Sequence, residues 1–146
     1  MTEDRVVSAE RVVHADPAAV FAIVADPREH PRMDGNGNTE AAQDAGPITA
    51  AGQSFLMRNT NGKIRENRVV EFDAGRLVAW MPCPVGGEPF GFLWRWEVVP
   101  HPEGALVTHT YEWTTLTRDD LLDEARSITP SNLLASLERL AGLVEG

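Results

Sequence analysis

The chain has 146 residues, close to the roughly 150 of a typical domain, so we expect one domain over residues 1–146. Its 13 Lys and Arg against 22 Asp and Glu give a net charge of −9, which repels nucleic-acid phosphates and anionic membranes. No apolar stretch approaches the roughly 18–20 residues that span a bilayer. We therefore expect no nucleic-acid binding and no membrane insertion. The single cysteine, and an N-terminus without a basic-then-apolar signal, favour a cytoplasmic location.

The first third of the chain predicts one strand followed by short helices. Residues 5–14 are rich in β-branched side chains, which favour a strand. Pro17 suits the first turn of a helix, and the Asp26-Pro27 pair ends that helix. We expect a second helical turn near 28–30 and one short edge strand near 38–43.

β-strand signals dominate from Gly52 onward. Turn residues recur every 8–12 positions, and Asn61-Gly62 is the strongest hairpin signal in the chain. This spacing predicts a meander of antiparallel strands. The predicted strands cover residues 53–60, 63–72, 76–83, 89–99 and 105–115.

The last thirty residues change to a helical period. Leu133, Leu137, Leu140 and Val144 recur at intervals of three or four, which gives a helix one broad apolar face. Thr129 as N-cap and Pro130 at the first position mark where this helix begins. A shorter helical stretch is expected over 119–126. The predicted fold class is α+β, with the C-terminal helix covering one face of the sheet.

Strand parity indicates which side chains meet that helix. Successive side chains of a strand point to opposite faces, so the bulky apolar ones at even positions of 89–99 form one stripe. In 105–115 the odd positions are the better candidates for the inner face. This set either fills the interior or lines a partly open cavity. Its members are Phe90, Phe92, Trp94, Trp96, Val98, Val107, His109, Tyr111 and Trp113, with Phe55, Met57, Trp80, Leu133 and Leu137 on neighbouring elements.

Few polar side chains are candidates for chemistry. His109 and Tyr111 share a strand face, where they would orient a carbonyl or phenol or transfer protons; alternatively, His109 is a core residue bonded to a backbone carbonyl. Glu66 and Arg68 also share a face, opposite to Arg65 and Asn67, and parity does not decide which pair points inward. An inward Glu66–Arg68 pair would be a costly buried charge and would favour function; an outward one is a solvated strand face.

The sequence carries no recognised metal or cofactor motif. The four histidines lack the spacing of a zinc site, so we expect no metal and no cofactor. No cation near Cys83 in the sequence would lower its pKa, which favours an inert thiol.

Four segments carry a family resemblance. The runs VSAERVVHADPAAVFAIVADPREHP, VVEFDAGRLVAW and WRWEVVPHPEGALVTHTYEW, together with the final leucine-rich helix, resemble the START-related polyketide cyclase/dehydrase superfamily (SRPBCC). The resemblance implies the helix-grip fold, a curved antiparallel sheet of about seven strands wrapped around a long C-terminal helix. It also implies a cavity for an apolar or aromatic molecule and places His30 and Met33 at the cavity mouth.

Three functions are compatible with this resemblance, because the fold hosts many activities. The leading hypothesis is binding of a small hydrophobic molecule, aromatic, polyketide-like or lipid-like, in the cavity. The first alternative is a polyketide aromatase/cyclase or dehydratase, so whether the chain is an enzyme stays open. The second is a co-chaperone-like interaction module, which predicts a filled interior and an exposed apolar patch. A homodimer is compatible with all three.

Overall fold

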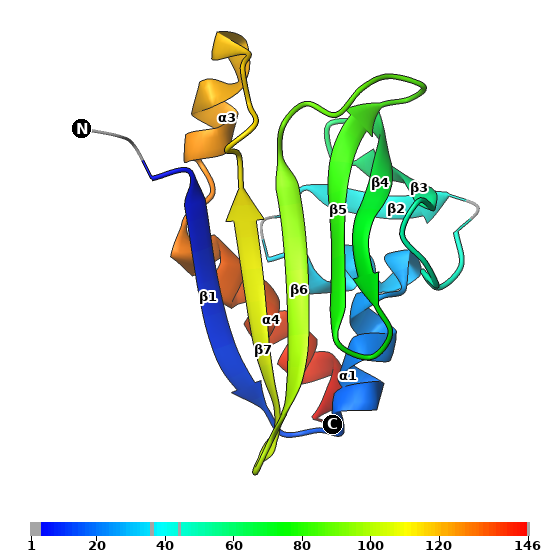
Figure 1. Ribbon diagram of the computed structural model, residues 1–146, viewed down its shortest axis with the longest axis vertical. Coiled ribbons are helices and arrows are strands. Elements are labelled where there is room, and N and C mark those ends of the chain that lie inside the picture. Colours follow the sequence, from blue (N-terminus) through cyan, green and yellow to red (C-terminus); the bar gives the residue numbers. More distant parts are fainter. Residues whose placement is uncertain (1–3, 36, 44, 146) are drawn as a thin grey trace.

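The computed structural model describes residues 4–35, 37–43 and 45–145. Its elements follow the predicted order of strand, short helices, six strands and long C-terminal helix (Figure 1). They are β1 (Val6–Val13), α1 (Pro17–Val24), the 3₁₀ turn η1 (Pro27–Glu29), α2 (His30–Met33), β2 (Thr39–Gln43), β3 (Ser54–Asn59), β4 (Ile64–Asp73), β5 (Leu77–Pro84), β6 (Leu93–His101), β7 (Gly104–Glu112), the 3₁₀ turn η2 (Asp119–Leu121), α3 (Leu122–Arg126) and α4 (Pro130–Val144).

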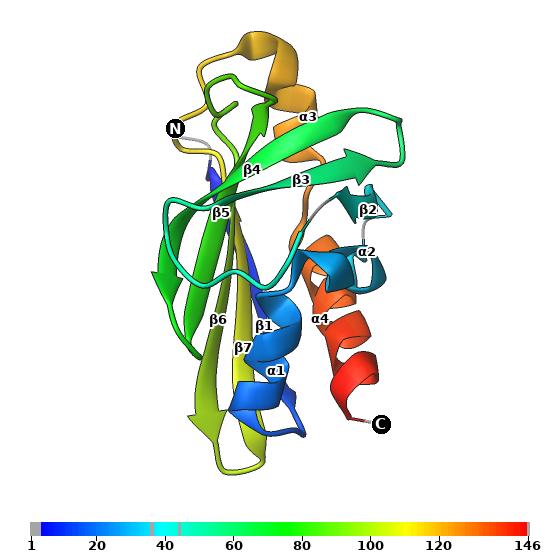
Figure 2. The same ribbon diagram turned by 90° about the vertical axis from the view of Figure 1, so that its right-hand side faces the viewer.

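The strands form one antiparallel sheet in the order β1-β7-β6-β5-β4-β3-β2. The predicted meander is confirmed for β2 to β7, which pair in chain order. β1 pairs with β7, its most distant strand in the sequence, so that β1 and β2 form the two edges. The sheet curves around the helices on one side, as Figure 2 shows, which confirms the helix-grip fold.

Two helices, rather than α4 alone, cover the inner face of the sheet. In α4 the predicted residues Leu133, Leu137 and Leu140 are fully buried, and Val144 at the end of the helix is partly buried. The backbone N–H of Thr129 donates to the side-chain oxygen of Asn132 at 2.8 Å, which fixes the start of the helix. The structure adds α1, which packs against β6, β7 and α4 beside it (Figure 2). Its eight residues are short, but three of them are buried in the core: Val20, Phe21 and Val24.

The central hairpin is shorter than its sequence suggests. β6 begins at Leu93 instead of residue 89, because Pro89 has no N–H to donate and Gly91 adopts φ +115°, which side chains rarely allow. A side chain at Gly91 would also collide with the backbone of Leu116. β7 ends at Glu112, so Trp113 lies beyond the strand although its side chain is buried.

A bulge in β4 decides which of its side chains face inward. Val69 pairs with Trp80 and Glu71 with Ala79, so Val70 has no opposite residue and is exposed. Odd positions up to Val69 therefore point to the inner face, and after the bulge the even position Phe72 does so. A single parity cannot describe this strand, which explains why the sequence left its orientation open.

Candidate functional site

A pocket of about 450 Å³ lies between the inner face of the sheet and the helical elements. This volume falls within the roughly 300–1,000 Å³ typical of small-molecule sites. Every strand from β3 to β7 contributes to the lining, as do α2, η2, α3 and α4. The lining residues include His30, Met33, Phe55, Met57, Arg65, Asn67, Trp80, Pro82, Phe90, Phe92, Trp94, Trp96, His109, Tyr111, Leu121, Glu124, Ser127, Ile128 and Ser136.

Aromatic rings form the sheet side of the pocket. Trp80, Trp94 and Tyr111 are paired in register across the adjacent strands β5, β6 and β7, so their side chains form one row. The ring centroids of Trp94 and Tyr111 are 4.4 Å apart. Phe92 stacks on Tyr111 at 6.0 Å. These contacts hold flat apolar surfaces in place before any ligand arrives.

His109 occupies the next row of the sheet and is 3% exposed. Its ring stacks on Trp96, with 3.7 Å between ring centroids, and faces Trp94 at 5.6 Å. Nδ1 donates to the carbonyl oxygen of Arg95 at 3.1 Å, because a carbonyl can only accept. Burial lowers the pKa of His109 to about 3, so the imidazole is neutral at physiological pH.

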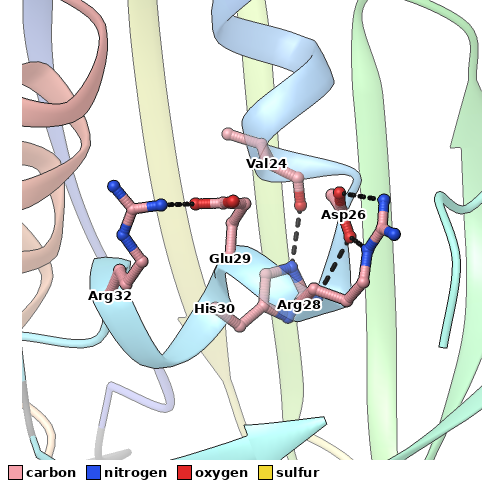
Figure 3. A network of polar contacts seen from close by, with 6 residues as sticks. All are labelled: Val24, Asp26, Arg28, Glu29, His30 and Arg32. Atoms are coloured by element: carbon pink, nitrogen blue, oxygen red, sulfur yellow. Dashed lines mark hydrogen bonds and ion pairs between the residues drawn. The ribbon is translucent and has the colours of Figure 1, made fainter. Parts of the chain in front are cut away.

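His30 sits on the helical side of the pocket. Its Nε2 donates to the carbonyl oxygen of Val24 at 2.8 Å (Figure 3), satisfying a carbonyl in the last turn of α1. Its ring stacks on Trp80, with 4.7 Å between centroids. Burial lowers the pKa of His30 to about 4. His30 and Met33 are 6% and 2% exposed, so they form an inner wall and not the mouth that the sequence suggested.

Ion pairs on the outer side of η1 and α2 hold this wall in position (Figure 3). The guanidinium of Arg28 donates twice to the carboxylate of Asp26, at 2.9 and 2.8 Å. Arg32 donates to Glu29 at 2.7 Å. The two arginines are exposed and their carboxylate partners are partly buried, so the pairs act mainly as local restraints on the chain that carries His30.

Among the residues described, two buried polar side chains of the pocket have no hydrogen-bond partner. The side chains of Asn67 and Tyr111 are 6% and 2% exposed, and neither has a hydrogen bond to the residues that the structure describes. Burial, followed by the charge of Glu124, raises the pKa of Tyr111 above its ordinary value. A buried polar atom without a partner costs about 1–3 kcal/mol. Water or ligand atoms in the pocket would remove that cost.

The mouth of the pocket lies between the β3–β4 turn and α3. The lining residues there are exposed: Thr60 and Asn61 on one side, Glu124 and Ser127 on the other. Arg65 approaches the mouth from β4, with its guanidinium 4.9 Å from the ring centre of Phe90. Charged groups therefore gather at the mouth, whereas the inner walls carry neutral rings.

Most of the residues singled out in the sequence meet at this pocket. Those on its walls are His30, Met33, Phe55, Met57, Trp80, Phe90, Phe92, Trp94, Trp96, His109 and Tyr111. Five others are buried elsewhere in the core: Trp113, beneath the Arg5 guanidinium, the strand residues Val98 and Val107, and the helix residues Leu133 and Leu137.

Glu66 and Arg68 point to the opposite face of the sheet, away from the pocket. Glu66 accepts from the N–H of Gly86 at 3.0 Å, and Arg68 donates to the carbonyl of Gly87 at 2.6 Å, so the pair anchors the turn after β5. Arg65 and Asn67 take the inward positions, as the bulge requires. The sequence predicted the short helix near α3 but not its position at the pocket mouth, because no local pattern indicates where a surface helix docks.

No metal centre is evident within 4–35, 37–43 and 45–145, where no three His, Cys, Asp or Glu side chains converge. Burial raises the pKa of the Cys83 thiol above its ordinary value, which makes it a poor nucleophile. The buried polar groups of the pocket therefore include two neutral imidazoles, a phenol and an amide among aromatic rings, and the charged groups of the lining are Asp34, Arg65 and Glu124.

The structure is that of a helix-grip protein with an internal pocket between sheet and helices. The chain belongs to the family described as polyketide cyclase/dehydrase and lipid transport, whose model matches residues 4–145, and with it to the SRPBCC superfamily. Over the residues described, no helix is both long and apolar enough to cross a bilayer.

Similar proteins agree with this assignment. An uncharacterized protein of Mycobacterium tuberculosis is 32% identical over 108 residues, which cover 69% of this chain and 44% of that protein, so the match spans less than half of the relative. A solved protein of Mesorhizobium loti has a TM-score of 0.70 at 14% identity and covers 95% of this chain and 96% of its own. The Aha1 dimer of Colwellia psychrerythraea has a TM-score of 0.64 at 15% identity, with 96% of each chain covered. At such identities the two structures show the fold alone.

Proposed function

We propose that this chain binds a small, hydrophobic, ring-containing molecule in the pocket between sheet and helices. The observation that carries the proposal is the pocket itself, with about 450 Å³ of space among preformed aromatic walls. Burying apolar ligand surface there gains about 25 cal/mol per Å². The unpartnered side chains of Tyr111 and Asn67 supply points that fix the orientation of the ligand.

Two variants at exposed serines test this proposal. Ser127 lines the mouth, whereas Ser131 lies on the surface at the start of α4. We expect Ser127→Trp to block the mouth and to weaken binding of the neutral fluorescent probe N-phenyl-1-naphthylamine about tenfold or more, which corresponds to about 1.4 kcal/mol. Ser131→Trp is the matched control and should bind the probe as the parent chain does.

The outcomes of this titration are distinct. Enhanced probe emission that Ser127→Trp abolishes and Ser131→Trp preserves supports binding in the pocket. Equal binding by all three chains places the probe elsewhere and contradicts the proposal. A chain that binds neither this probe nor a panel of aromatic and fatty ligands contradicts it as well.

A polyketide cyclase or dehydratase is the second candidate, favoured by the imidazole and phenol on one pocket wall. His109 and Tyr111 are two residues apart on β7 and both line the pocket. However, burial lowers the pKa of His109 to about 3, and a base this weak is poorly matched to proton abstraction near neutral pH. Normal turnover of a polyketide substrate by a His109→Ala variant would remove this residue from any acid–base role.

The interaction-module hypothesis has less support, because it requires a filled interior. The large exposed apolar side chains on the described surface are also spread over β1, β4, the turn after β5 and α4: Val6, Ile64, Val70, Val85 and Leu134. A homodimer remains compatible with the proposal, and one structural neighbour is a dimer. Light scattering on the purified chain measures its mass directly.

A further inference from the structure

We propose that the ligand presents a neutral hydroxyl or N–H group that donates to the remaining ring nitrogen of His109 or to that of His30. The inference rests on the proposed function and deepens it, since it names the chemical class of the ligand. That class is a neutral hydrogen-bond donor on an apolar ring system, such as a phenol. It depends on how the protein itself fixes both imidazoles.

In each imidazole the ring N–H already donates a hydrogen bond to a backbone carbonyl. In a neutral imidazole one nitrogen donates and the other accepts, and the hydrogen bond that one nitrogen makes sets the role of the other. Nδ1 of His109 donates to Arg95, and Nε2 of His30 donates to Val24. The remaining nitrogens, Nε2 of His109 and Nδ1 of His30, therefore carry lone pairs and can only accept.

Neither of these acceptors has a protein partner among the residues described, and both rings line the pocket. His109 and His30 are 3% and 6% exposed, so only water or ligand atoms inside the pocket can reach these nitrogens. An unsatisfied buried acceptor costs about 1–3 kcal/mol. A ligand that brings a donor to either position removes this cost, whereas a purely apolar ligand leaves it in place.

The same arrangement selects against an anionic group placed against either imidazole. A carboxylate only accepts, so it would face a lone pair on either ring. Protonation of the rings would reverse this preference, but burial lowers the pKa values of His109 and His30 to about 3 and 4. A positive charge on His30 would lower the pKa of His109 further. The rings consequently stay neutral near pH 7.

Other polar groups of the pocket determine which additional polar atoms a ligand can carry. The phenol of Tyr111 and the amide of Asn67 can both donate and accept, so they tolerate a second oxygen of either kind. Arg65 lies two residues before Asn67 on β4, and its guanidinium stands beside Phe90 toward the mouth. A negative group on the ligand would therefore be held near Arg65, away from the imidazoles.

Two probes of similar shape test the inference. In 2-naphthol a hydroxyl replaces the methyl group of 2-methylnaphthalene, so only the former is a donor. Calorimetric dissociation constants are measured for both probes with the parent chain and with His109→Phe, whose ring can still stack on Trp96. Because one buried hydrogen bond contributes about 1 kcal/mol or more, we expect the preference for 2-naphthol to fall about tenfold in the variant. Taking the ratio of the two probes cancels their difference in hydrophobicity.

His101→Phe is the matched control, since His101 ends β6 outside the pocket. Its probe preference should equal that of the parent chain. If both probes bind and His109→Phe leaves their ratio unchanged, the donor inference is overturned while the proposed function stands. If neither probe binds to the parent chain, the proposed function fails and the inference fails with it.

A second measurement does not depend on the folding of the variant. Long-range ¹H–¹⁵N spectra of the parent chain report which imidazole nitrogens carry protons. We expect His109 to be protonated at Nδ1 and His30 at Nε2, and the unprotonated nitrogen of His109 to shift with 2-naphthol but not with 2-methylnaphthalene. The opposite tautomers, or equal shifts with both probes, would overturn the inference.

Discussion

Gly35, between α2 and β2, packs so closely against α4 that no side chain fits. A Cβ atom there would lie 2.6 Å from the backbone nitrogen of Ser136 and 2.7 Å from the backbone carbon of Ala135. Ordinary contact begins at 3.4 Å, so Gly35→Ala must push α4 and the α2 segment apart by about 0.8 Å. Such overpacking costs about 1–3 kcal/mol. The displacement also weakens the 2.9 Å hydrogen bond from the N–H of Gly35 to the hydroxyl of Ser136.

The helix itself provides the matched control. Gly142 lies inside α4 with no atom within 4 Å of its Cβ position, so Gly142→Ala should stabilise the fold by up to about 1 kcal/mol through helix propensity. Thermal unfolding monitored by circular dichroism measures both, because 1 kcal/mol shifts the midpoint by roughly 2–4 °C in a chain of this size. The two Gly→Ala changes should move the midpoint in opposite directions. A Gly35→Ala chain as stable as the parent would refute the close-packing argument.

Two further predictions concern the buried histidines and the helix core. Burial lowers the pKa values of His30 and His109 from 6.5 to about 4 and 3, so between pH 7 and 5 the unfolded chain binds two protons that the folded chain does not. The free energy of unfolding should therefore fall by about 3–4 kcal/mol between pH 7 and 5 in urea titrations. His109→Phe should remove about half of that fall. A parent chain with equal stability at both pH values would contradict the burial of neutral imidazoles. Leu137 is fully buried, whereas Leu134 is 40% exposed. Leu137→Ala should therefore lower the free energy of unfolding by about 2–5 kcal/mol in the same assay, and Leu134→Ala should lower it much less. Equal losses of stability would mean that α4 is oriented differently.

Local sequence patterns were sufficient to predict which side chains of β6, β7 and α4 point into the interior. The alternation in β6 and β7 correctly placed Trp94, Trp96 and Tyr111 toward the helices, because a strand without a bulge keeps one parity throughout. The helical period likewise identified the buried face of α4. Both signals survive in a single sequence because each depends only on the geometry of its own element.

β4 shows why the same reasoning fails elsewhere. Its bulge after Val69 changes the parity within one strand, and the apolar residues Val69, Val70 and Phe72 therefore follow no simple alternation. The bulge exists only in the pairing of β4 with β5, and the residues of β4 alone do not show how the two strands pair. The orientation of Arg65 and Asn67 followed from that pairing.

The sequence by itself determined the elements, their order and the aromatic character of the interior, since strand and helix periodicities are properties of neighbouring residues. Only the tertiary structure decided that β1 pairs with β7 at one edge of the sheet, that α1 helps α4 to cover the inner face, and that α3 lies at the pocket mouth. It also decided which nitrogen of each imidazole is left to accept, because the carbonyls of Arg95 and Val24 reach the rings only in the folded chain. Hydrogen-bond roles in a buried site depend on atoms that folding brings together, and no local pattern encodes them.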